Sequence, residues 1–151
     1  MKRMLLLAVI CGSALMSVLA ACGTRYAQSA RTVAYEDGVY RGVFIDGDEI
    51  QVNVQFALEG NRVQSIGFRR LYAKGDDYLH AEEGSLEARL RDEYRTLLDH
   101  LLGKDIRAHL SDLHTPEDIA SDVDGLTAAT MRSSKLVSAI RDGLNRGVYS
   151  Y

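Results

Sequence analysis

Three segments in the first half of the chain are predicted to be strands from their apolar and polar positions. The clearest is 49–58, whose apolar positions are Ile50, Val52, Val54, Phe56 and Leu58. Flanking strands are predicted over 38–45, with Val39, Val43 and Ile45 on one side, and over 62–71, with Val63, Ile66 and Phe68. The short sequences 46–48 and 59–61 are turn signals, so we expect an antiparallel meander.

The second half of the chain has a helical period instead. After a polar loop over 72–84, leucines and Tyr94 recur every three or four residues across 85–102, with Ser85 and Gly103 as the predicted caps. A short helical turn is expected at 115–118, with Pro116 in its first position. The last predicted helix spans 133–144, is capped by Ser133, and has an apolar stripe of Leu136, Val137, Ile140 and Leu144. The pattern predicts an α+β domain in which helices pack on an antiparallel β-sheet meander.

The N-terminus has the features of an export signal rather than of a folded element. Lys2 and Arg3 precede an apolar stretch over 4–18, which is short for a membrane-spanning helix. The following Leu19-Ala20-Ala21-Cys22 resembles the lipobox of bacterial lipoproteins, in which the cysteine thiol is acylated. We therefore expect a signal peptide over 1–21, a lipidated tether over 22–35 and a domain over 36–151, exported and anchored on the periplasmic or extracellular face of a membrane. The alternative is an ordinary secretory signal that contains a cysteine.

Composition narrows the chemistry further. The formal charge of −3 provides no general basic field, so we expect no nucleic acid partner. Cleavage before Cys22 would remove Cys11 and leave no thiol for a disulfide or a thiolate metal site. The four histidines, His80, His100, His109 and His114, lack the tight spacing of a metal site, so none is expected. Any redox chemistry must come from a bound cofactor.

A loop of small and hydroxylated residues leads into the last predicted helix. Helix N-termini have unpaired N–H groups and a partial positive charge, and small residues let a phosphate approach them. The same composition also suits plain capping, so the loop alone leaves both interpretations open. The candidate cofactor-binding residues are Asp124, Gly125, Leu126, Thr127, Ala128, Ala129, Thr130, Met131, Ser133 and Ser134.

Residues 124–130 match the pattern Asp-x-x-(Ser/Thr)-(Gly/Ala)-Ala-Thr. This resembles the flavinylation motif of the FMN-binding domain family, which includes extracytoplasmic subunits of the sodium-pumping NADH:quinone reductase and of the Rnf complex. The resemblance implies that Thr130 is esterified to the phosphate of FMN by an FAD:protein FMN transferase, which uses magnesium and FAD and releases AMP. It also implies an FMN-binding-domain-like fold. Ala128 stands where many members have glycine.

The resemblance extends from residue 37 to about residue 147, although 72–113 fits only loosely. The stretch Asp37-Gly38-Val39-Tyr40-Arg41-Gly42 is similar to the opening Asp-Gly-x-Tyr-x-Gly of family domains. An alternating strand, a glycine hairpin and a helix after the motif follow in the same order. Tyr72 and Tyr78, in the loop after the third strand, are candidates for contact with the flavin ring, and Met131 is another; surface or core positions are the alternative for all three.

These features predict an exported flavoprotein that relays electrons between donor and acceptor proteins, which the sequence does not identify. It is not expected to turn over a substrate of its own, so no catalytic residue is assigned. Its other expected partners are the membrane lipid at Cys22 and the transferase. Two alternatives stay open: a lipoprotein that binds FMN without a covalent bond, and a non-redox module that binds another ligand or a partner protein.

Overall fold

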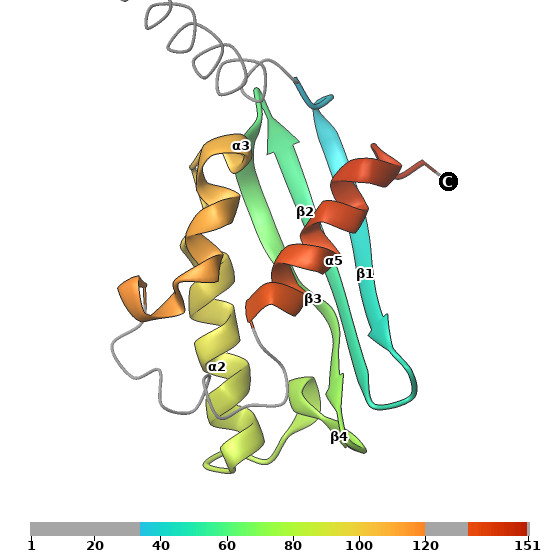
Figure 1. The fold of residues 1–151 in the computed structure, drawn as a ribbon, viewed down its shortest axis with the longest axis vertical. Coiled ribbons are helices and arrows are strands. Elements are labelled where there is room, and N and C mark those ends of the chain that lie inside the picture. Colours follow the sequence, from blue (N-terminus) through green and yellow to red (C-terminus); the bar gives the residue numbers. More distant parts are fainter. Residues whose placement is uncertain (1–33, 120–132, 151) are drawn as a thin grey trace, which may run out of the picture. The chain divides into compact units, whose positions relative to one another are not determined.

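A sheet of four antiparallel strands, in the order β1-β2-β3-β4, carries the helices α2 and α5 on one face (Figure 1). The computed structural model describes residues 34–119 and 133–150. In chain order the elements are β1 (Gly38–Asp46), β2 (Ile50–Glu59), β3 (Arg62–Ala73), β4 (Asp76–Asp77), η1 (Tyr78–His80), α2 (Leu86–Asp99), α3 (Ile106–His109), η2 (Leu110–His114), η3 (Pro116–Asp118) and α5 (Ser133–Arg146). The predicted α+β class and antiparallel meander are confirmed, and the likeness to FMN-binding domains stays a prediction.

The central strand β2 supplies the middle of the hydrophobic core. Its five apolar residues identified from the alternation are all buried, each exposing 3% or less of its surface. Phe56 stacks on Tyr40 of β1 with ring centres 5.2 Å apart. The strict period of two in the sequence therefore gave the correct buried face of this strand.

If strand β3 alternated strictly, its apolar residues would lie on opposite faces of the sheet. Its pairing with β2 shifts between Ala57 and Leu58 and again between Asn53 and Val54, which places an extra β3 residue at each point. A bulge of this kind reverses the side on which the following residues lie. The two bulges keep four residues on the helix-covered face: Val63, Ile66, Phe68 and Leu71.

In β1 the predicted apolar side is the wrong one. Val39 and Ile45 expose 39% and 60% of their surface, whereas Tyr40 and Gly42 are buried and Phe44 packs against the core. The reason is the close approach of α5, because a Cβ at Gly42 would overlap the carbonyl oxygen of Ala139 and lie 2.7 Å from the amide nitrogen of Gly143. A glycine on the inner face carries no hydrophobic signal, so the sequence pattern favoured the other side.

Helix α2 begins as predicted, because the Ser85 side chain accepts a hydrogen bond from the Ala88 N–H at 3.1 Å. It ends at Asp99, earlier than expected, and His100 is its C-cap. The chain then turns to pair with the start of β3, where the Gly103 N–H donates to the Val63 carbonyl at 2.8 Å. Gly103, with φ of +71°, thus ends this turn rather than capping the helix.

Two further segments differ from the prediction, and one agrees with it. The polar loop expected over 72–84 contains the end of β3, the short strand β4 and the 3-10 turn η1. Pro116 stands at the start of η3, as predicted. Helix α5 includes Ser133 as a helical residue rather than as a cap, and it continues to Arg146 instead of ending at residue 144.

Among the described residues, those of the hydrophobic core lie between Tyr40 and Leu144, within the compact unit Ala34–Tyr151. A unit that encloses its own core has the main requirement for folding alone. Within residues 34–119 and 133–150, no helix is both long enough and apolar enough to cross a bilayer.

Candidate functional site

The predicted attachment residue Thr130 lies outside the described residues, as do the rest of the loop over 124–131 and the lipidation candidate Cys22. Of the predicted site, the structure describes Ser133 and Ser134, which are the first two residues of α5 as it is described. Thr130 precedes Ser133 by three positions in the sequence. The start of α5 and the elements that hold it are therefore the part of the site whose geometry is known.

Helix α5 is firmly placed on the sheet. Its predicted stripe is buried, and Ala139 and Gly143 are buried as well. The helix meets β1 at a glycine pair, since a Cβ at Gly143 would lie 3.1 Å from the Gly42 amide nitrogen and 3.1 Å from the Phe56 ring. The Asp142 carboxylate also accepts the Val43 N–H at 2.8 Å, which satisfies a donor on the outer edge of β1. A loop joined to this helix starts from a fixed point.

The first turn of α5 has the composition of an anion site. It contains two hydroxyl side chains and no acidic residue. Lys135 adds a cation whose ammonium lies 3.7 Å from the Asp46 carboxylate and 5.8 Å from the centre of the Phe44 ring. With the partial positive charge of the helix N-terminus, these groups suit a phosphate ester on the preceding residues. Lys135, which the sequence did not single out, is a further candidate at this end of α5.

The two tyrosines considered for flavin contact lie in different places. Tyr72 pairs with Gln51, on the face of the sheet away from the helices, and the Arg70 guanidinium lies 5.5 Å from its ring centre. That position disagrees with a role beside α5. Tyr78 belongs to η1 and packs against the core, where burial raises its pKa above the ordinary value. In Figure 1, α5 begins toward the end of the sheet where β4 and η1 lie, which keeps Tyr78 as a candidate.

Two histidines meet one carboxylate between α2 and η2. The Asp112 carboxylate accepts a hydrogen bond from His100 at 3.0 Å and another from His109 at 3.0 Å. These bonds are the main cause of a lowered pKa for Asp112. The Lys104 ammonium also lies against the His100 ring, 3.0 Å from Nε2 and 3.1 Å from Nδ1. Within the described ranges, no group of three or more histidine, cysteine or acidic side chains is arranged to hold a metal ion. The cluster ties α2, α3 and η2 together.

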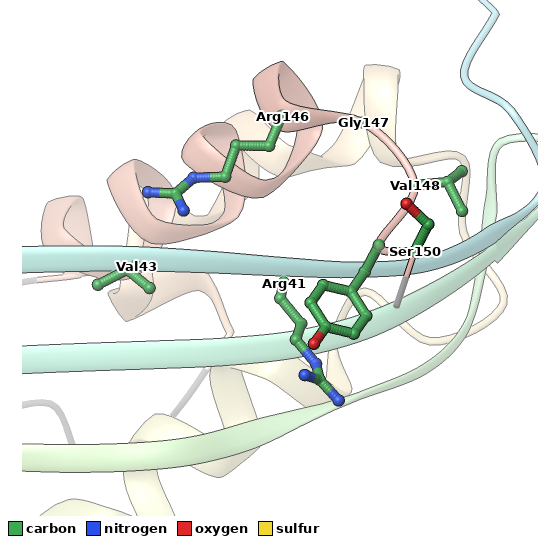
Figure 2. Close-up of a pocket in the computed structure, with 7 residues that line it drawn as sticks. Arg41, Val43, Arg146, Gly147, Val148 and Ser150 are labelled. Carbon is green, nitrogen blue, oxygen red and sulfur yellow. The ribbon is translucent and has the colours of Figure 1, made fainter.

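A surface pocket of about 410 Å³ lies at the opposite end of α5 from Ser133. Figure 2 shows Arg41 on β1 and Arg146 on α5 at this pocket, with the C-terminal residues Val148 and Ser150 to the right of Arg41. Arg41 lies over the Tyr149 ring at 3.7 Å from its centre, and Arg146 donates to Asp142 at 2.9 Å. Because α5 has 14 residues, about 20 Å of helix separates this pocket from the predicted flavin loop.

Comparisons with protein-family models, with curated proteins and with solved structures found no match to this chain. Its function must therefore be argued from its own residues.

Proposed function

We propose that this protein is an exported, lipid-anchored electron-transfer protein that carries FMN esterified through its phosphate to Thr130. The observation that carries the proposal is the heptapeptide Asp124-Gly125-Leu126-Thr127-Ala128-Ala129-Thr130, placed just before a well-held helix in a chain with an export signal. The heptapeptide resembles the flavinylation motif, and the antiparallel sheet with helices on one face is compatible with a domain of that kind.

The described residues fit the phosphate end of the cofactor. Thr130 supplies the hydroxyl that forms the ester, and the first turn of α5 supplies donors for the phosphate oxygens through its N–H groups and through Ser133 and Ser134. Lys135, whose ammonium lies 3.7 Å from the Asp46 carboxylate, would add a positive charge at the helix start. Residues 124–129 and Met131 shape the loop that the transferase must recognise. Bound FMN would supply one- and two-electron transfer, which no side chain of this protein provides.

A covalent link suits the proposed location. A cofactor that dissociates outside the cytoplasm is lost to the surroundings, and retaining it by binding alone needs a deep pocket. An ester at Thr130 keeps the flavin without such a pocket, and it leaves the ring accessible to donor and acceptor proteins.

The experiment is an intact-mass measurement on the chain from residue 23 onward, coexpressed with an FAD:protein FMN transferase. Wild-type protein should gain the mass of one FMN less one water, and the Thr130→Ala variant should gain nothing. Thr96→Ala is the matched control, because Thr96 lies on the exposed side of α2, where its hydroxyl bonds only to the Asp92 carbonyl. That variant should gain the full mass.

The alternatives give different results. Noncovalent FMN would colour the protein but leave its denatured mass unchanged in all three forms. A non-redox module would be colourless and unmodified, which would overturn the proposal. A mass gain that persists in Thr130→Ala would keep the flavin but contradict the attachment residue.

A further inference from the structure

The face of the sheet away from α2 and α5 is rich in arginine and side-chain amides. Gln55 lies at its centre, and its carbonyl oxygen accepts one hydrogen bond from Arg41 at 2.9 Å and one from Arg69 at 3.0 Å. The neighbouring Arg70 lies over the Tyr72 ring. We call these five residues the arginine face. In the described part of the chain, no helix packs against it (Figure 1).

The arginine face has an excess of positive charge. Arg69 and Arg70 are exposed, and neither forms an ion pair with a described residue. The bordering carboxylate is Asp77 of β4, whose pKa is lowered mainly by its hydrogen bond with His80 and only slightly by Arg70. A guanidinium presents several N–H donors in one plane, which suits phosphate and carboxylate groups. The surface is therefore complementary to an anionic partner.

The geometry points to one partner: the anionic phospholipid surface to which the protein is anchored, an inference that rests on the proposed lipid at Cys22. About 15 residues separate Cys22 from β1, and even fully extended they reach only about 50 Å. The domain would therefore stay at a millimolar effective concentration beside the headgroups. Tyrosine rings and arginines are both suited to the headgroup region of a membrane.

Because the tether keeps the domain beside the membrane, a small basic surface is enough for the domain to dock. Each arginine near an anionic membrane strengthens association about fivefold, so two or three of them hold a free protein only weakly. By holding the domain beside the headgroups, the tether raises the docked fraction that the same surface gives. A soluble acidic protein would gain nothing from the tether. Docking by the arginine face would leave α5 and the proposed flavin site on the side away from the lipid, open to soluble redox partners.

The test uses the processed chain from Cys22, coupled through that thiol to maleimide lipid in vesicles. The chain has no tryptophan, so a Tyr72→Trp variant supplies a single reporter on the arginine face. Energy transfer from it to a dansyl headgroup lipid should be stronger in phosphatidylglycerol vesicles than in phosphatidylcholine vesicles. Adding Arg69→Gln and Arg70→Gln should lower the docked-to-undocked ratio about 25-fold. Salt should weaken docking in the same direction.

The matched control removes the same charge elsewhere. Arg89 and Arg95 are exposed on α2, on the helix-covered side, so Arg89→Gln with Arg95→Gln should leave the transfer nearly unchanged. Equal transfer in both vesicle types would overturn the inference, and is the result expected if an acidic protein occupies this face. An equal loss of energy transfer in the Arg69/Arg70 and the Arg89/Arg95 double variants would also overturn the inference. Maleimide coupling and a Thr130→Ala background make the result independent of whether the cell lipidates or flavinylates the chain.

Discussion

At the scale of single residues, the opening stretch 37–42 has clear structural tasks. The Asp37 carboxylate accepts the Gly60 N–H at 2.7 Å and so holds the turn between β2 and β3. The Tyr40 hydroxyl donates to the Glu36 carbonyl at 2.6 Å while its ring stacks in the core. Gly42 admits α5. The part of the resemblance that lies here is thus explained by packing, and it supports the placement of α5 rather than flavin chemistry itself.

Gly42 should be the least replaceable glycine of the sheet. A Gly42→Ala variant forces a methyl group against the backbone of α5, so we expect a loss of about 1–3 kcal/mol or more in the free energy of unfolding. Gly67→Ala in β3 is the matched control, because a Cβ there meets nothing within 4 Å. Urea unfolding followed by circular dichroism measures both. Similar midpoints for the two variants would contradict the close contact.

Asp112 should stabilise the fold in a pH-dependent manner. Its pKa is lowered from the ordinary 3.8, first by the hydrogen bond from His100 and then by that from His109. A carboxyl group with a lowered pKa stabilises the folded state above its unfolded pKa, and this contribution disappears as the pH falls through the folded pKa. The Asp112 side chain is 37% exposed, so we expect no more than about 1 kcal/mol at neutral pH.

The variant Asp112→Asn tests this contribution by urea unfolding at neutral pH and at several values below pH 3.8. The wild-type advantage should be present at neutral pH and should shrink toward zero at the acid end. Asp99→Asn, an exposed acid at the end of α2, is the control and should show no such trend. An advantage that grows on acidification would have the wrong sign for this account.

At the scale of elements, the sequence correctly predicted the buried faces that follow from the spacing of hydrophobic residues. The buried face of β2 and the stripe of α5 follow from strict spacing, and both are confirmed. The inner side of β1 was missed because Gly42 replaces a large apolar residue where two backbones meet. The early end of α2 was missed because it depends on pairing with Val63, about 40 residues away in the chain. Contacts between residues far apart in the chain leave no pattern in the local sequence.

The N-terminus of α2 offers an element-scale test. The Ser85 hydroxyl satisfies one of the N–H groups that a helix start leaves unpaired, so Ser85→Ala should cost about 1 kcal/mol in the free energy of unfolding. Ser138→Ala is the comparison, because that hydroxyl only bonds back to the Ser134 carbonyl within α5. It should be neutral or slightly stabilising. A larger effect at position 138 than at position 85 would refute the cap.

At the scale of the whole molecule, the two faces of the sheet have different proposed roles. The helix-covered face builds the core and fixes the start of α5, while the opposite face presents Arg69 and Arg70 to the surroundings. The sequence alone predicted helix α5, whereas the loop before it lies outside the described residues and stays a prediction. The sequence did not predict that Lys135 would lie beside Asp46 and Phe44, because those residues come together only when α5 packs on β1.

Anchoring and flavin attachment should be separable in the whole chain. Lipidation needs a thiolate nucleophile, so Cys22→Ser expressed in a bacterium should lose labelling by palmitate, whereas Cys11→Ser should keep it because the proposed cleavage would remove residue 11. The proposed attachment at Thr130 would need the loop and the transferase with its FAD and magnesium, but no lipid. The exported Cys22→Ser protein should therefore still gain one FMN in its intact mass. Labelling that survives Cys22→Ser would place the lipid elsewhere, and flavin lost along with the label would mean that the transferase acts only on membrane-held protein.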